Sequence, residues 1–175
     1  ASVANAIDIL AAVTNDASNY VALSATATGG FTVDWGDGNT TTHTSAATAE
    51  HFYDYSDVDL GPLTTRGYKQ ALIKITPTTG GNSITAFDLG KKHSRTNLGA
   101  YSNNWLDIQV NCPSATSMTY RGGVESRWVE RVNILAIGAI TSLASAFTSC
   151  YSLQSVSFPA GSLASVTSLA SAFNN

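Results

Sequence analysis

The chain has 175 residues, of which 43% are hydrophobic and only 12% are charged, about half the charged share of an average globular protein. This length suits one ordinary domain or two small ones and is sufficient to bury a core. The formal net charge of -3 at pH 7 argues against nucleic acid as a partner, and no apolar run approaches the roughly 20 residues that span a bilayer.

The composition favours β-structure. Few lysines and glutamates, many β-branched residues and 14 glycines are typical of strands and turns rather than of long helices. Two cysteines, Cys112 and Cys150, are too few for a disulfide scaffold and match no metal-ligand spacing. We therefore expect a mostly β protein. Its two cysteines point neither to a reducing nor to an oxidising compartment.

The first two predicted strands are residues 7–13 and 20–26, because they flank the turn-forming run 15–19. A short helix over residues 4–13 is the competing interpretation, since alanine and leucine permit it. With the strands predicted over residues 31–35 and 39–44, the chain would form a meander.

The stretch Phe31 to Gly38 is the anchor of this first part. Phe31, Val33 and Trp35 alternate with polar residues, which predicts a strand with three large apolar side chains on one face. Gly36 and Gly38 flank Asp37, so the strand is expected to end in a tight turn that leads into an antiparallel partner. A buried tryptophan beside this turn would hold the core.

An irregular acidic stretch separates residues 50–55 from the next predicted strand. Residues 67–76 alternate clearly, with Ala71, Ile73 and Ile75 on one face, and Pro77 closes the run. The loop 78–82 is a plausible boundary. We therefore predict two domains, residues 1–80 and residues 81–175.

The second part is repetitive. Residues 141–147 recur identically as residues 167–173, an offset of 26, and the apolar-x-apolar triplets 108–110, 132–134 and 156–158 lie 24 apart. Such a period predicts a solenoid in which each coil adds a short strand to a growing sheet. Because the chain stops midway through a unit, we expect the natural polypeptide to continue. The predicted repeat core is Ile108, Val110, Val132, Ile134, Leu143, Phe147, Cys150, Leu153, Val156, Phe158, Leu169 and Phe173.

Residues 20–76 resemble an immunoglobulin-like β-sandwich of the PKD type. Val33-Asp-Trp-Gly-Asp-Gly38 is similar to that family's Trp/Phe-Gly-Asp-Gly signature, and the segment 54–66 is longer than its usual turn. The corresponding motif residues are Trp35, Gly36, Asp37, Gly38, His51, Tyr53 and Tyr68.

Residues 105–175 resemble BspA-like leucine-rich repeats. The resemblance rests on the segment Ala146 to Leu153 and on residues 156–158, which follow it. By this resemblance Cys150 is a small hydrophobe that stacks along the solenoid. The chain, which joins a Trp-Gly-Asp-Gly domain to such repeats, is similar to structural proteins of marine tailed bacteriophages. It implies a virion component, exposed as an appendage or decoration.

Catalysis is not expected. None of the three histidines, His43, His51 and His93, stands in an arrangement that sequence can join to a nucleophile. For His51 we expect a half-buried side chain that bonds to backbone near a sheet edge. We expect no enzyme and no cofactor.

Three further features have a functional alternative. Asp54, Asp57 and Asp59 are weak candidates for a calcium loop, although solvated carboxylates are the more ordinary explanation. The basic run 91–95 is a solvated loop or an anion site. Trp105, Trp128, Tyr101 and Tyr120 would form a sugar-stacking platform if exposed, with core packing the default for Trp105.

The combined expectation is a noncatalytic display module on a virion surface or otherwise outside the cell. Its partners would be other virion proteins and repeated copies of the chain, with a host-surface glycan or protein as a further partner. The alternative is a bacterial cell-surface adhesin. An accessory domain of a carbohydrate-active enzyme is a third class.

Overall fold

The structure is a computed structural model that describes residues 4–15, 18–95, 103–120 and 127–174. In this part of the chain all regular elements are strands, so the expected mostly β fold is confirmed. No described element is a helix that could cross a membrane. The strands are β1 (Ala6–Val13), β2 (Tyr20–Ala27), β3 (Phe31–Asp34), β4 (Thr40–His43), β5 (Ala49–Phe52), β6 (Lys69–Pro77), β7 (Ile84–Asp88), β8 (Trp105–Cys112), β9 (Ser117–Thr119), β10 (Arg131–Ile137) and β11 (Ser155–Ser157).

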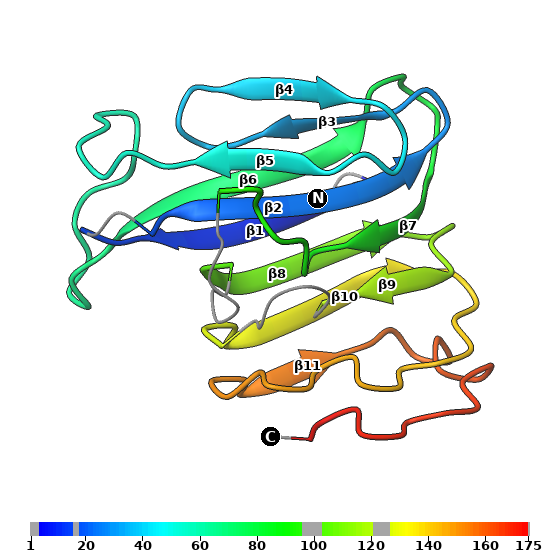
Figure 1. Cartoon of the computed structure of the whole chain (residues 1–175). Helices are drawn as coiled ribbons and strands as arrows, with labels where there is room; N and C mark the ends of the chain where they lie inside the picture. The colour runs from blue at the N-terminus through cyan, green and yellow to red at the C-terminus, as the bar shows by residue number, and fades with distance from the viewer. Residues whose placement is uncertain (1–3, 16–17, 96–102, 121–126, 175) are drawn as a thin grey trace.

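The strands form two sheets that pack face to face (Figure 1). The larger sheet has seven strands in the order β11-β10-β8-β1-β6-β3-β4, and the smaller has four in the order β5-β2-β7-β9. One large cluster of buried side chains lies between them and draws residues from both sheets. Alternation of side chains along each strand explains this arrangement, because every second residue points into the shared core.

The hairpin of β3 and β4 forms as the sequence predicts. Phe31, Val33 and Trp35 are all fully buried, and the Trp35 N–H donates to the Asn39 carbonyl across the turn at 2.9 Å. Gly36 has a φ of 76°, and a Cβ at this position would lie 2.4 Å from the Leu72 carbonyl oxygen. Only glycine allows β6 to approach the turn this closely.

Strand β6 confirms the alternation expected from its sequence. Ala71, Ile73 and Ile75 are buried, whereas Leu72 is 59% exposed on the opposite face. The strand pairs with β3 on one side and β1 on the other.

The predicted meander is wrong, and so is the alternative helix over residues 4–13. Strand β1 belongs to the larger sheet and β2 to the smaller one, so the connection between them crosses from one layer to the other. Turn-forming residues permit a crossing of this kind as readily as a hairpin. Asn19 supports the crossing, because its side-chain amide donates to the Thr14 carbonyl at 2.8 Å.

The last three strands of the larger sheet repeat the period seen in the sequence. Strand β10 is parallel to both β8 and β11, and its Val132 pairs with Ile108 on one side and Val156 on the other. Each step between these partners is 24 residues. The three triplets therefore occupy neighbouring positions of one sheet, as predicted.

The second layer carries the same repeat. Segment 167–174 runs beside segment 141–149 through backbone hydrogen bonds, including Ser145 N–H to the Ala170 carbonyl at 2.9 Å and Phe147 N–H to the Ala172 carbonyl at 2.8 Å. Each of these bonds spans 25 residues. Aromatic rings stack along this direction, with Tyr120 against Phe147 at 5.1 Å and Phe147 against Phe173 at 5.3 Å between centroids.

The predicted repeat core is only partly buried. Leu169 and Phe173 are 60% and 61% exposed, so their assignment to the core is wrong. They belong to the last described segment of the stack, and no other described element packs over them. Leu153, Val156 and Phe158 are partly buried against the core, and the buried members are Ile108, Val110, Val132, Ile134, Leu143, Phe147 and Cys150.

The predicted boundary near residue 80 falls in the connection between β6 and β7. Strands from both sides of it share both sheets, because β1 pairs with β6 and β8, and β2 pairs with β5 and β7. The division into two domains stays a prediction, and its boundary does not correspond to a break in either sheet.

Candidate functional site

The residues of the Trp-Gly-Asp-Gly motif converge on one buried cluster. His51 Nε2 lies 2.6 Å from Asp37 Oδ2, and the two side chains are 14% and 3% exposed. The His51 ring stacks on Trp35 with the planes 10° apart and meets Tyr53 edge-on. The Tyr53 hydroxyl donates to the Trp35 carbonyl at 2.7 Å. Burial and the Asp37 carboxylate raise the pKa of Tyr53, so this hydroxyl stays protonated.

The contacts within this cluster stabilise the fold. Asp37 also accepts the Asn39 N–H at 3.1 Å, so its carboxylate joins the hairpin turn to β5. His51 is half-buried on the edge strand β5, as expected, and its Nε2 contacts the Asp37 carboxylate where a backbone partner was predicted. A buried charge is tolerated when a partner and hydrogen bonds compensate it. Tyr68 lies apart from the cluster, on the opposite face of the larger sheet with Ala12 and Leu106.

The other two histidines also have structural partners. His43 Nε2 lies 2.8 Å from the Thr41 hydroxyl, which accepts a hydrogen bond from the Trp35 indole N–H. His93 Nε2 lies 3.9 Å from a Glu50 carboxylate oxygen. The thiol of Cys112 is buried, and burial raises its pKa to about 12, which suppresses the reactive thiolate. The absence of catalysis stays a prediction.

The candidate calcium loop does not gather its carboxylates. Asp54 Oδ1 accepts hydrogen bonds from the backbone and hydroxyl of Ser56, and these bonds lower the pKa of Asp54. Asp57 Oδ1 accepts the Asp59 N–H at 2.9 Å. Across the described residues no group of three or more acidic, histidine or cysteine side chains is placed to hold a metal ion. The carboxylates of Asp54 and Asp57 accept the hydrogen bonds of local turns.

The basic run is partly neutralised by acidic neighbours. Lys91 lies 3.7 Å from Asp88, and Glu50 accepts hydrogen bonds from the backbone and hydroxyl of Ser94. These contacts favour the interpretation as a solvated loop over an anion site.

Of the three described members of the proposed sugar platform, one is exposed. Trp105 and Tyr120 are buried in the core, and the Trp105 indole donates to the Leu89 carbonyl at 2.8 Å. Tyr101 lies outside the described residues. Trp128 is 42% exposed and is the member of the set that remains available for contact.

Three large apolar side chains are exposed in the described segment that follows β11. Strand β11 is an edge strand of the larger sheet, at the bottom of Figure 1 beside the C-terminal segment. Phe173, Leu169 and Leu163 are 61%, 60% and 40% exposed in that segment.

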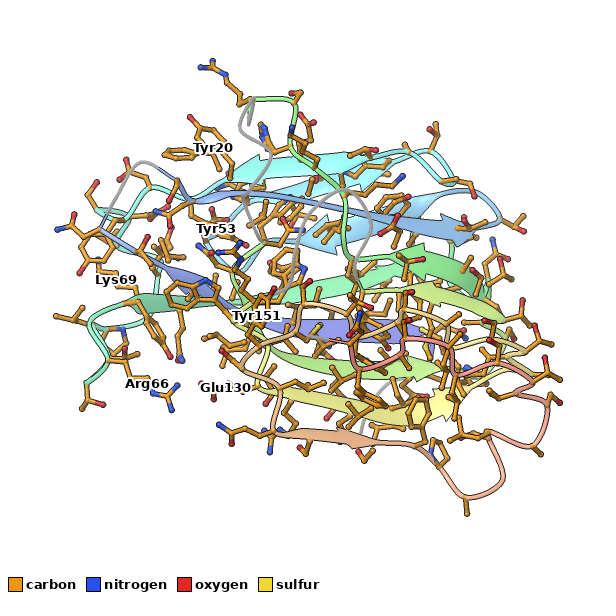
Figure 2. All side chains as sticks on the ribbon, turned by 60° about the horizontal axis from the view of Figure 1, so that its bottom comes forward. Tyr20, Tyr53, Arg66, Lys69, Glu130 and Tyr151 are labelled. Atoms are coloured by element: carbon orange, nitrogen blue, oxygen red, sulfur yellow. The ribbon has the colours of Figure 1, made fainter. Side chains whose placement is uncertain are left out.

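Sequence reasoning missed the polar residues beside the apolar triplets. The Arg131 guanidinium donates to Asp107, with Nε 3.0 Å from Oδ2, and the Ser157 hydroxyl donates to Asn133 Oδ1 at 2.6 Å. Each pair is separated by 24 residues. The period of the triplets, applied to their polar neighbours, would have found both contacts. Figure 2 shows the adjacent pair Arg66 and Glu130, which brings the loop before β6 against the start of β10.

No family model, no curated protein and no solved structure matches this chain.

Proposed function

We propose that this chain is a noncatalytic structural and display module of a virion, and that it assembles with other virion proteins or with further copies of itself. In this proposal residues 20–76 form a PKD-type sandwich and residues 105–175 form BspA-like repeats. The location is the particle surface. The proposal covers a capsid decoration, a fibre and a tail-associated protein alike.

The parallel register of β8, β10 and β11 is the observation that carries the proposal. Successive strands advance by the same 24 residues. Strands that follow one another in a constant register form a regular and rigid array, which is suited to display. The buried Asp37–His51 pair and the Trp35 anchor support a rigid sandwich at the other end.

Immunogold electron microscopy with an antibody against this chain tests the proposal. Particles from infected cultures of the bacterium that carries the phage should be labelled at a regular position with several copies each. Labelling of uninfected cell envelopes, with unlabelled particles, would contradict the virion role.

The alternative is a bacterial cell-surface adhesin for glycan or protein. The exposed Trp128, which lines a depression together with Arg66 and Glu130, favours it. The labelling experiment separates the two functions, because an adhesin would be found on the cell envelope.

A further inference from the structure

The outer face of the larger sheet, which points away from the smaller sheet, carries a continuous groove. Its central depression has a volume of about 550 Å³, within the usual range of ligand pockets. A depression of about 340 Å³ beside Trp128 shares Tyr68 and Leu106 with it, and one of about 500 Å³ shares Leu10 and Asp107. The groove therefore runs from Trp128 across the face to Leu72 and Asn133.

The strand register arranges the groove in rows. Leu10 lies opposite Leu72 on β6 and opposite Asp107 on β8, and Arg131 lies opposite both Asp107 and Ser155. This row crosses five strands, or roughly 19 Å at the usual spacing between strands. A parallel row beside it is polar throughout and consists of Lys74, Asp8, Gln109, Asn133 and Ser157.

The charges along the groove compensate each other. Arg131 pairs with Asp107, and Arg66 pairs with Glu130. Lys74 Nζ lies 2.7 Å from Asp8 Oδ1. Because each cation faces an anion, the groove has little net attraction for a polyanion or a polycation. Guanidinium, carboxylate and amide groups nevertheless keep further hydrogen-bonding positions, since each has several donors or acceptors.

The apolar part of the groove lies at one end. Tyr68 and Leu106 are buried in its floor, and Trp128 stands beside them with 42% of its surface exposed. An amphipathic aromatic ring of this kind covers apolar C–H surface while its edge remains hydrated. A ring next to densely spaced donors and acceptors is suited to a ligand that alternates C–H faces with hydroxyl groups.

From these observations we propose that the groove is a binding site for a neutral oligosaccharide. A sugar ring stacks on Trp128, and the hydroxyl groups of the following units hydrogen-bond to Asp107, Arg131 and Asn133. Each hydroxyl both donates and accepts, so a surface of paired charges and amides satisfies it without requiring ligand charge. The inference holds for a display module and for an adhesin, because it depends on the groove alone.

Titration of the purified chain with neutral hexasaccharides tests the site, with calorimetry and tryptophan fluorescence as readouts. The panel contains β-1,4-glucan, α-1,4-glucan, α-mannan and β-1,4-linked N-acetylglucosamine, with a heparin hexasaccharide as the anionic comparison. At least one neutral member should bind saturably and change the fluorescence of Trp128, since Trp35 and Trp105 are buried.

Two groove variants and one matched control localise the binding. Trp128→Ala should weaken it by about tenfold, the scale expected for loss of an aromatic contact. Asn133→Ala, on the exposed face of β10, should weaken it without disturbing the core. Phe52→Ala is the control, because Phe52 is 43% exposed but lies on β5 of the smaller sheet, and it should bind like the original chain.

Three results would overturn the inference. These are no saturable binding of any neutral hexasaccharide at millimolar concentration, binding of the heparin fragment alone, and unchanged affinity in both groove variants with their melting temperatures retained. None of these results bears on whether the chain is part of a virion, which the labelling experiment decides separately.

Discussion

Asp37 and His51 show how one pair of side chains joins two distant segments. The carboxylate comes from the turn after β3 and the imidazole from β5, and both are largely shielded from water by Trp35 and Tyr53. Removing one partner of such a pair leaves the other buried without compensation. Breaking this pair by removing one partner is therefore expected to cost more stability than breaking an exposed ion pair.

Replacing Asp37 by alanine should lower the free energy of unfolding by about 3 kcal/mol, because His51 and the Asn39 N–H both lose their acceptor. Urea denaturation at pH 7 measures the change. Lys91→Ala is the control, since Lys91 pairs with Asp88 in solvent and its loss should cost less than about 1 kcal/mol. Equal effects of the two substitutions would refute the structural role of the buried pair.

His43 makes stability depend on pH. Partial burial lowers its pKa below the ordinary value of 6.5. The folded state therefore favours the neutral ring, whose Nε2 lies 2.8 Å from the Thr41 hydroxyl. The unfolded chain binds a proton at higher pH than the folded chain. The contribution of His43 to the free energy of unfolding is fully present above pH 6.5 and decreases as the pH falls below that value.

The urea midpoint of the original chain should therefore fall more between pH 7.5 and pH 5 than that of His43→Gln. The variant removes the titrating ring, and its remaining pH dependence comes from other groups. The same fall in both proteins would show that His43 has no part in it.

At the scale of elements, β10 holds the repetitive part to the rest of the larger sheet. It pairs with β8 and β11, and its side chains alternate between the core and the outer groove. Ile134 is 2% exposed and Leu135, its neighbour in the chain, is 40% exposed. Adjacent positions on one strand therefore have opposite roles.

Ile134→Ala should destabilise the protein by about 3 kcal/mol, because it leaves a cavity opposite Val110 in the core. Leu135→Ala should cost less than about 1 kcal/mol, since this side chain is substantially solvated. Thermal or urea denaturation of the two variants measures both values. A larger loss for Leu135→Ala would contradict the assigned faces of β10.

The acidic loop before β6 should be independent of calcium. Asp54 and Asp57 are occupied by turn hydrogen bonds and do not converge on a common point. The melting temperature should be the same in excess EDTA and in millimolar calcium chloride. A rise of several degrees with calcium, abolished in Asp57→Asn, would restore the calcium interpretation.

At the scale of the whole molecule, both predicted parts share one core. Strand β1 lies between β6 and β8, and the same buried cluster contains Trp35 from the first part and Phe147 from the second. Shared burial couples the stability of one part to that of the other, because neither keeps its apolar surface covered alone.

Differential scanning calorimetry should therefore show a single unfolding transition, with equal calorimetric and van't Hoff enthalpies. The shared sheets supply the coupling. Two resolved transitions would instead support independent domains divided near residue 80.

The sequence by itself determined the local features of this protein. Alternation predicted the buried face of β6, glycine spacing predicted the turn after Trp35, and the 24-residue period predicted that Val132 lies between Ile108 and Val156. The first two features depend on backbone preferences and on side-chain direction along single strands, which neighbouring residues express directly, whereas the third depends on a repeat that returns every 24 residues.

Only the tertiary structure decided which elements became neighbours. The crossing of β1 and β2 into different sheets, the choice of Asp37 as the partner of His51, and the exposure of Phe173 all depend on packing between distant segments. The groove beside Trp128 arises in the same way, from strands that are brought together across the chain. The pairing of distant segments depends on the total apolar surface that the whole fold buries. That total cannot be read from any short stretch of the sequence.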